Sequence, residues 1–413
     1  MVAPSNSPRI PVEPVSHETF DWIPRAPQMY SRAEVERQTG AYQAAVTAPI
    51  LDLRLQISGE DSADVEDATR QLISFDEHAQ RVLGADNPAL GPMTAILLRT
   101  ESASSSQIEQ LTTSAKQLAL AEIDEGDKAN ALMVIGNVRA MEAALRLSAD
   151  VSEDSILAMH TALLRHQPGF EHEAGRYRRE QVWIGMGNAG PRTADFVAPH
   201  HARIPEAITD LVGFIKRQDL PVLAQVAIAH AQFETIHPFV DGNGRTGRAI
   251  AQSVLRNKGL VASTAVPISA GLLVDTERYF AALTAYRSGD AGPIIRQFAG
   301  ASRIAASTGS QLVDDLVAEL ERSRAMMNGL RSDATAWRLL PDLVGQPAVN
   351  MRYLTGALGF GEMTALRAVD SLVERGVLVE STGKGRNRVW QHRGILDVLD
   401  AYAARIRRMS ARD

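Results

Sequence analysis

The sequence predicts a mainly α-helical protein with one short β-hairpin and a C-terminal winged helix-turn-helix. Apolar residues recur at helical spacing through most of the 413 residues, whereas alternation of β-branched and aromatic residues is scarce. Near the C-terminus, three short helical segments precede a basic hairpin, which is the order of elements in a winged helix. The hydrophobic fraction of 45% and the charged fraction of 22% are typical of globular proteins, so we expect order over most of the chain.

Charge and cysteine content exclude several classes of function. The net charge of −6 does not mark the whole chain as a binder of nucleic acid or membrane, so any basic site must be local. The absence of cysteine excludes disulfides, cysteine nucleophiles and Cys-ligated zinc. No apolar run of about 18 residues is present, and the proline-rich N-terminus lacks the apolar core of a signal peptide. We therefore expect a cytoplasmic protein with no membrane partner.

An extended arm and one helix are expected at the N-terminus. Prolines recur through residues 1–27 and prevent regular helix or central strand there. We expect this arm to lie over the rest of the protein and to bury its large apolar side chains, which are Phe20, Trp22 and Ile23. The pattern over residues 31–58 is helical, and Ser31 with Glu34 forms a capping box at its start.

Helices are expected to dominate the rest of the chain. A serine cluster, Ser102 to Ser106, interrupts the second of them, and Gly84 suits the C-cap of the first. Gln181–Ile184 is an exception, a short strand that ends in a glycine turn. The helical segments are residues 62–84, 93–123, 129–150, 152–168, 220–236, 246–260, 276–289, 293–330, 334–344, 349–359 and 362–376, and the basic hairpin covers 377–393.

A glycine-rich polar cluster separates two of these helices, in the stretch FETIHPFVDGNGRTGRAIAQ from Phe233 to Gln252. Gly242, Gly244 and Gly247 stand at the start of the second helix, where glycine permits positive φ and close approach of a ligand to the backbone. Backbone N–H groups at a helix N-terminus form an anion-binding concavity, which the helix dipole reinforces. The cluster therefore predicts a phosphate site.

The side chains of the cluster suit a polyphosphate with Mg²⁺ and a base beside it. Arg245 and Arg248 supply fixed positive charge for phosphate oxygens. Asp241 is a hard oxygen ligand of the type that Mg²⁺ prefers. Asn243 can donate a hydrogen bond to a phosphate oxygen, and His237 can take up a proton near neutral pH.

Other interpretations of the cluster fit less well. A two-residue Asn-Gly hairpin is disfavoured because both flanks are helical. An EF-hand loop needs Gly at its sixth position and Glu at its twelfth, where this chain has Thr246 and Gln252. The Gly-Lys-Ser/Thr ending of a Walker loop is absent. A buried structural histidine is the remaining alternative for His237.

The segment HPFVDGNGRTGR resembles the signature of the Fic family, His-Pro-Phe-x-Asp/Glu-Gly-Asn-Gly-Arg-x-x-Arg, at every defined position. The resemblance implies a helical core that transfers AMP from ATP to a hydroxyl of a target protein. It implies that His237 deprotonates a Ser, Thr or Tyr hydroxyl and that Asp241 holds Mg²⁺ on the α- and β-phosphates. Arg245 would support the β-phosphate and Arg248 the γ-phosphate. The full set of implied ATP-binding residues in the motif is Gly242, Asn243, Gly244, Arg245, Thr246, Gly247 and Arg248.

Gly244 bears on the type of reaction. Relatives of the Doc branch, which act as kinases, carry Lys at this place and turn the nucleotide round. Glycine at position 244 therefore favours AMP transfer over phosphate transfer.

Two further regions extend the resemblance. Residues 175–211 resemble the family's flap, an edge hairpin that aligns the target backbone by strand addition. Within it we interpret His200 and His201 as surface residues, because adjacent residues in a loop rarely chelate one metal together. Tyr279 matches a tyrosine-rich helix that lines the adenine pocket in relatives, where its ring would stack on the base. A core tyrosine is the alternative.

The serine cluster resembles the family's inhibitory helix motif, Ser/Thr-x-x-x-Glu-Gly/Asn, from Ser105 to Gln110. The resemblance implies that Glu109 pairs with Arg248 and fills the space of a γ-phosphate, so that ATP binds only in an unproductive pose. Gln110 departs from the Gly or Asn of the motif, which leaves the local geometry open. A solvent-exposed glutamate on an ordinary helix is the alternative for Glu109.

Three domains are expected: residues 1–115 with the inhibitory motif, 116–325 with the catalytic core, and 330–413 as the winged helix. In a winged helix, residues 362–376 would enter a DNA major groove and the wing would contact phosphate. Protein docking or dimerisation is the alternative role of such a domain. The positive charges in and after the wing are Lys384, Arg386, Arg388, Arg405, Arg407, Arg408 and Arg412.

The sequence thus predicts an ATP- and Mg²⁺-dependent protein adenylyltransferase, restrained by Glu109, that acts on a partner protein or on itself. Two alternatives remain, of which the first uses the same residues. One is the reverse reaction, in which Glu109 orients a water that removes AMP from a protein. The other is a DNA-binding regulator whose core only senses ATP, although mere ligand binding does not need the base His237. Since relatives are often dimers, we expect a homodimer.

Overall fold

The computed structural model describes residues 8–83, 90–165, 167–185, 189–262, 264–381 and 387–411. It is mainly helical with short antiparallel strands, as the sequence predicts. The chain divides into two compact units, and the three-domain division stays a prediction. Unit 1 comprises Met1–Asp67, Ala143–Lys258 and Glu277–Ala299, and unit 2 comprises Ala68–Glu142, Gly259–Thr276 and Gly300–Asp413.

Unit 1 holds the predicted catalytic motif, between two of its helices. Its strands are β1 (Ser16–Trp22), β2 (Gly40–Val46), β3 (Trp183–Ile184) and β4 (Phe196–Val197). Its short 3-10 turns are η1 (Pro27–Met29), η2 (Glu171–Glu173), η3 (Pro191–Thr193) and η4 (His201–Arg203). Its helices are α1 (Arg32–Gln38), the start of α2 (Gly59–Leu83), the end of α5 (Ala129–Arg146), α6 (Glu153–Leu164), α7 (Ile204–Lys216), α8 (Val222–Ile236), α9 (Asn243–Asn257), α11 (Thr276–Arg287) and the start of α12 (Gly292–Met326).

Unit 2 holds the predicted inhibitory motif and the C-terminal segments. Its helices are the rest of α2, α5 and α12, together with α3 (Leu90–Ile108), α4 (Ala115–Glu122), α10 (Ile268–Val274), α13 (Thr335–Gly345), the π-helix η5 (Tyr353–Ala357), α14 (Glu362–Glu374) and α15 (Arg393–Ser410). Its strands β5 (Ala348–Asn350), β6 (Val379–Glu380) and β7 (Val389–Gln391) form one antiparallel sheet in the order β5-β7-β6.

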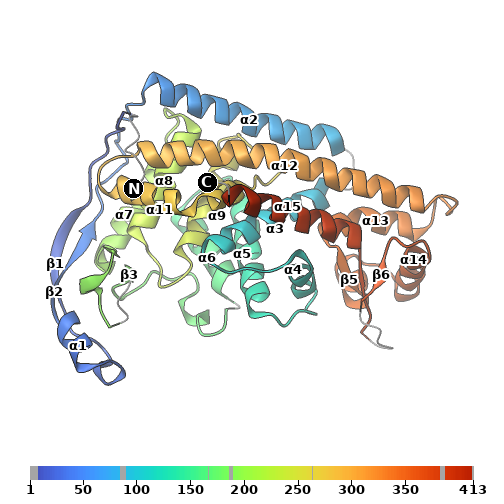
Figure 1. Ribbon diagram of the computed structural model, residues 1–413, viewed down its shortest axis with the longest axis horizontal. Helices are drawn as coiled ribbons and strands as arrows, with labels where there is room; N and C mark the ends of the chain where they lie inside the picture. The colour runs from blue at the N-terminus through green and yellow to red at the C-terminus, as the bar shows by residue number, and fades with distance from the viewer. Residues whose placement is uncertain are drawn as a thin grey trace. The chain divides into compact units, whose positions relative to one another are not determined.

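The N-terminal segment forms a two-stranded ribbon, which the sequence did not predict. β1 pairs with β2 in antiparallel register from Ser16↔Val46 to Trp22↔Gly40, and Figure 1 shows this ribbon in blue with α1 at its far end. The predicted helix over residues 31–58 is therefore wrong after Gln38, although the Ser31 hydroxyl caps α1 by accepting from the Glu34 N–H at 3.2 Å. Pairing with a distant segment has overridden the local helical pattern.

Burial of the N-terminal apolar side chains is only partly as expected. Phe20 and Trp22 are half-buried on the ribbon, whereas Ile23, which follows β1, is 75% exposed. The expectation for Ile23 is therefore wrong. Its neighbours on the ribbon pack in a small cluster with buried Tyr42, Ala44 and Val197.

α8 is the most buried helix of unit 1, and its composition explains this position. Every residue after Val222 is buried, because most of the helix is apolar or small and its polar side chains bond inside the protein. For example, the Gln225 amide donates to the Phe214 carbonyl at 2.7 Å and the Gln232 amide to the Ala48 carbonyl at 2.9 Å. It packs against α7 and α9. The predicted helix over residues 220–236 is thus confirmed. The next predicted helix also ends as expected, with Gly259 at a φ of 73° after α9. Gly84 lies outside the described residues.

The serine cluster does not interrupt a helix, so that prediction is wrong. α3 runs continuously through it to Ile108. The Ser102 hydroxyl donates to the Leu98 carbonyl at 2.8 Å, which satisfies a polar group inside a helix. The Asn137 amide donates to the Ser102 carbonyl at 2.9 Å and to the Ser106 hydroxyl at 3.2 Å. Small hydroxyls that bond within the protein therefore line the buried side of α3.

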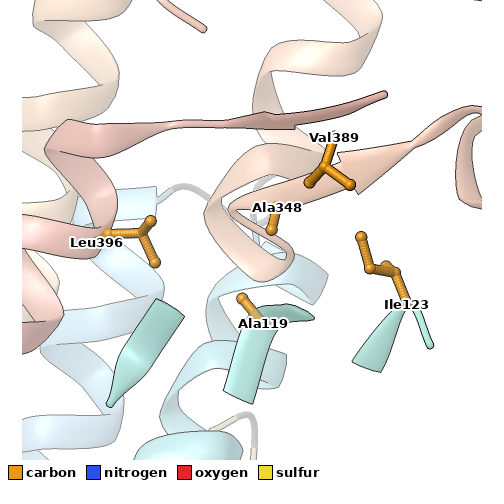
Figure 2. Close-up of a cluster of buried hydrophobic side chains, with 5 residues drawn as sticks. All are labelled: Ala119, Ile123, Ala348, Val389 and Leu396. Atoms are coloured by element: carbon orange, nitrogen blue, oxygen red, sulfur yellow. The ribbon is translucent and has the colours of Figure 1, made fainter. Parts of the chain in front are cut away.

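The C-terminal segment combines helices with a three-stranded sheet, and its assignment as a winged helix stays a prediction. The predicted helix over residues 349–359 is shorter than expected, because β5 covers its start and the helical residues run from 351 to 357, mostly as the π-helix η5. α15 was not predicted, yet it buries a continuous apolar face. Figure 2 shows one contact of this region, where Ala119 of α4 and Ile123, the residue that follows this helix, meet the sheet and α15 within unit 2. The residues of this cluster are Ala119, Ile123, Ala348, Val389 and Leu396.

Two of the basic residues predicted near the wing are held in ion pairs. Arg388 bonds to the Glu380 carboxylate at 2.6 Å and lies over the Trp390 ring. Arg405 bonds to Asp315 at 3.3 Å. Their charges are thus partly neutralised, which weakens the predicted phosphate contact. Lys384, Arg386 and Arg412 lie outside the described residues. Among the described residues, no helix combines the length and the hydropathy needed to cross a membrane.

Candidate active site

His237 ends α8 in a conformation that non-glycine residues rarely adopt. Its φ of 49° and ψ of 60° are left-handed, and its N–H donates to the Phe233 carbonyl at 2.9 Å. Such backbone strain persists only where the surroundings enforce it, and it is frequent at functional sites. The turn leaves the His237 side chain 19% exposed at the junction between α8 and α9.

The His237 imidazole is neutral and has one nitrogen available. Nδ1 faces the Glu234 carbonyl oxygen at 3.4 Å, and because a carbonyl only accepts, this contact assigns the proton to Nδ1. The lone pair is then on Nε2. Burial, followed by the charges of Arg287 and Arg178, lowers the pKa of His237 to about 3. The ring is therefore unprotonated at neutral pH, as a general base must be.

The loop after His237 is held by Asn243. The Asn243 Oδ1 accepts from the Phe239 N–H and its Nδ2 donates to the Phe239 carbonyl, both at 2.9 Å. Both ends of the amide thus bond within the protein, and because the Nδ2 amide carries two N–H groups, one of them is left for the phosphate contact that stays a prediction. Gly242 is required beside it, because its φ is 78° and an added Cβ would lie 2.6 Å from Leu163 Cδ2.

Asp241 is an ionised carboxylate with an exposed part. Its Oδ2 accepts from Gln167 at 2.9 Å and from Arg245 at 3.2 Å, and its side chain is 34% exposed. Burial raises the pKa of Asp241, but the Arg245 charge and the Gln167 hydrogen bond outweigh it and hold the pKa below its usual value. A charged, partly exposed oxygen fits Mg²⁺. The described residues contain no group of three or more His, Asp or Glu that could hold a metal.

A buried histidine that the sequence analysis did not identify, His160, holds this loop through its contacts with Asp241 and Phe239. His160 contacts the Asp241 carbonyl through Nε2 and accepts from the Gly175 N–H at Nδ1, both at 3.0 Å. Its ring stacks on Phe239 with centroids 3.6 Å apart. Burial lowers its pKa to about 4, so the ring is neutral and its tautomer is fixed. His160 and Gln167 carry no motif in the sequence, and only their three-dimensional contacts identify them.

The remaining motif residues lie in the first turns of α9 and differ in how deeply they are buried. Thr246, Arg245 and Arg248 are buried, and Gly244 is partly exposed. Gly247 faces α8, since an added Cβ would lie 3.0 Å from Phe233 Cδ1 and 3.2 Å from His230 Nδ1. The structure thus uses Gly247 for close helix packing.

Tyr279 is 1% exposed, and its hydroxyl is 2.7 Å from His230 Nε2. Its ring also lies near His230 and Phe280 rather than at an open surface. This burial favours the core tyrosine over the adenine-stacking residue that the resemblance implies.

The predicted flap is a short hairpin. β3 pairs with β4 at Trp183↔Val197 and Ile184↔Phe196, so the predicted strand over 181–184 is shorter than expected; residues 186–188 lie outside the described residues. After the hairpin, His200 stacks on Phe20 with centroids 4.7 Å apart.

The predicted inhibitory motif lies at the end of α3 in unit 2. Ser105 is buried in the helix, and Glu109 follows its last turn. Gln110 has a φ of 63°, the left-handed conformation that Gly or Asn adopts most readily. The Leu111 N–H donates to the Ser106 carbonyl at 3.0 Å and the Gln110 N–H to the Gln107 carbonyl at 2.9 Å, which closes the helix end. Gln110 therefore takes the geometry of the motif, and the pairing of Glu109 with Arg248 stays a prediction.

Comparison with known proteins gives a consistent picture. The model of the Fic/DOC family matches residues 150–255. The chain is 30% identical over 154 residues to a protein adenylyltransferase of Caenorhabditis elegans, a match covering 36% of this chain and 27% of the relative. It is 29% identical over 174 residues to a probable protein adenylyltransferase of Aquifex aeolicus, covering 40% and 50%. The chain thus spans a quarter to a half of the length of these relatives.

One solved structure resembles most of the chain. A Fic family protein from Desulfovibrio desulfuricans has 23% sequence identity and a TM-score of 0.50, over 82% of this chain and 97% of the other. This likeness supports the fold.

Proposed function

We propose, from the premise that residues 150–255 form a Fic/DOC-family domain, that this protein transfers AMP from ATP to a hydroxyl of a target protein or of itself. One observation supports the proposal above others. A neutral His237, held in a left-handed turn, precedes the ionised Asp241 and the glycine-rich start of α9. A base, an oxygen ligand and a helix N-terminus within one loop are what transfer of a nucleotide needs.

In this mechanism the loop positions the phosphates and His237 moves the proton. Nε2 of His237 takes the proton of the target hydroxyl as its oxygen bonds to the α-phosphorus, and the bond from that phosphorus to the β-phosphate oxygen breaks, so that pyrophosphate leaves. Asp241 would hold Mg²⁺, which when bound neutralises charge on the phosphates. The N-terminus of α9 and the Arg245 and Arg248 guanidinium groups add fixed positive charge.

The low pKa of His237 fits this role. Arg178 and Arg287 contribute to holding the imidazole neutral before the nucleotide arrives. The negative charge of bound phosphates favours the imidazolium, so nucleotide binding raises the pKa of His237 towards the range in which a base works best.

The test is a transfer assay with α-labelled ATP and Mg²⁺, read as label on the protein itself and on added proteins. We expect His237→Ala to lower transfer by about 100-fold or more, because the base is lost. His172→Ala is the matched control, since His172 has a 72% exposed side chain. Equal transfer by wild type and His237→Ala would overturn the role of His237.

We also propose that Glu109 restrains the reaction. The motif geometry at Ser105 and Gln110 supports this, because the helix end that presents Glu109 forms despite the unusual glutamine. Glu109→Gly should then increase label transfer over wild type, and Glu125→Gly, a change of another acidic residue in unit 2, should not. Unchanged transfer in Glu109→Gly would argue against restraint.

A further inference from the structure

Arg178 is a buried arginine that the mechanism above does not use as a ligand for substrate. It is 2% exposed and precedes the flap hairpin. Its guanidinium donates to three backbone carbonyls: Nε to His237 at 2.8 Å, Nη1 to Glu180 at 2.9 Å and Nη2 to Pro199 at 2.6 Å. The Arg178 N–H also donates to the Pro238 carbonyl at 3.0 Å.

These contacts join three segments of the chain whose relative positions matter for the proposed reaction. Glu180 stands just before the flap hairpin and Pro199 just after it, while His237 carries the proposed base. A single rigid side chain thus ties both ends of the hairpin to the backbone of His237. The planar fork of arginine, with five N–H donors, can make this set of bonds, whereas the lysine ammonium cannot reproduce the geometry.

The charge of Arg178 is not explained by an ion pair. Among the described residues no carboxylate forms a salt bridge with it, and all its partners in hydrogen bonds are carbonyl oxygens. Burial lowers the pKa of Arg178 to about 10, which leaves it charged at neutral pH. Burying a charge is unfavourable unless hydrogen bonds compensate for it, and here three carbonyl oxygens supply those bonds, so the contacts of Arg178 are structural.

The Gln181 side chain also links the two sides of the hairpin at its base. The Gln181 amide donates to the Ala198 carbonyl at 2.5 Å, and the Ala198 N–H donates to the Val182 carbonyl at 3.2 Å. The hairpin is therefore closed at its base by the two residues Arg178 and Gln181. Displacement of Arg178 would free the base of the flap and the left-handed turn at His237 together.

We propose that Arg178 is a positioning residue that fixes the flap and the His237 backbone as one unit, so that a target hydroxyl docked along the flap arrives at the His237 imidazole. This inference rests on the proposed function for the role of His237 and of the flap. The link between the flap and His237 itself rests only on the contacts of Arg178.

The test compares Arg178→Lys with Arg179→Lys, its exposed neighbour. Arg178→Lys keeps the charge that acts on His237 but loses the fork. We expect kcat for AMP transfer to fall about 10- to 100-fold, because a small misplacement of reacting groups has effects of this size. Affinity for ATP should stay within about twofold, since Arg178 bonds to none of the motif side chains. Arg179→Lys should match wild type in both.

A second measurement does not depend on the reaction. Hydrogen exchange in the nucleotide-free protein follows the amides of Asp195 and Ala198, which donate to Ile184 at 2.9 Å and to Val182 at 3.2 Å across the hairpin. We expect about tenfold faster exchange at these amides in Arg178→Lys, with no change at α8 amides. Arg178→Met, if it folds, should show a larger fall in kcat and a faster flap exchange than Arg178→Lys.

The two measurements separate the two proposals. If wild type transfers no AMP but flap exchange rises in Arg178→Lys, the proposed function fails while the link made by Arg178 stands. If wild type transfers AMP and Arg178→Lys retains wild-type kcat, Arg178 is not a positioning residue. Unchanged flap exchange in Arg178→Lys overturns the link whatever the transfer assay gives.

Discussion

Replacing Asn243 by alanine should open the loop between α8 and α9. The Asn243 amide satisfies both the N–H and the carbonyl of Phe239, at 2.9 Å each, and the residue is 3% exposed. Each buried backbone group left without a partner costs about 1–3 kcal/mol. Relaxation of the loop and entry of water recover part of this, so we expect the free energy of unfolding to fall by about 2–4 kcal/mol.

Urea unfolding, followed by circular dichroism and tryptophan fluorescence, measures this change. Asn257→Ala is the matched control in the same helix. Asn257 also donates to two carbonyls, Ser148 at 2.8 Å and Ala149 at 3.2 Å, but it is exposed, so water replaces its bonds and the loss should stay below about 1 kcal/mol. An Asn243→Ala variant as stable as Asn257→Ala would refute the argument that this amide holds the loop.

Three further predictions concern pH, helix packing and the end of α3. Burial lowers the pKa values of the buried His160 and His230 to about 4 and about 3, and that of the partly exposed His237 to about 3. A histidine in the unfolded chain takes up a proton near pH 6.5, whereas these three stay neutral in the folded protein until the pH is much lower. The free energy of unfolding is therefore highest above pH 6.5. For each histidine it falls by up to about 1.4 kcal/mol per pH unit as the pH drops towards 4. Urea midpoints measured between pH 7.5 and about pH 5 check this, and a midpoint that rises on acidification would contradict it. Gly247→Ala should destabilise by about 1–3 kcal/mol, because its Cβ would press on Phe233, whereas Gly300→Ala, whose Cβ meets nothing within 4 Å, should be neutral or stabilising in the same assay. Gln110→Gly should raise the melting temperature of the protein, since a left-handed φ of 63° is strained for glutamine by about 1 kcal/mol, and a lower melting temperature would argue against that conformation.

Local sequence patterns predicted the helices around the site well. The apolar composition of α8 and the glycines that follow α9 and α11 are signals that act within a few residues. The β1–β2 ribbon was missed because Ser16–Trp22 and Gly40–Val46 become strands only by pairing with each other. The amphipathic face of α15 was present in the sequence and is a signal that could have been used.

The motif of the candidate site could be recognised in the sequence, whereas the residues that hold it in place could not. His237 and Asp241 stand in one short segment with a distinctive pattern, so sequence alone located them. Arg178 and His160 come from other segments, and their roles follow from carbonyl groups that no sequence pattern marks. The sequence did not indicate that Asn243 also holds the loop or that Gly247 also permits close helix packing, whereas their contact with phosphate stays a prediction.

The most direct test of the central claim compares α-labelled with γ-labelled ATP, in wild type, Glu109→Gly and His237→Ala. The account predicts that the α label becomes covalently attached to protein, that the γ label does not, and that His237→Ala abolishes the attachment. Attachment of the γ label would contradict AMP transfer and indicate phosphate transfer. Absence of both labels in wild type and in Glu109→Gly, with ATP still bound, would contradict the proposed reaction altogether.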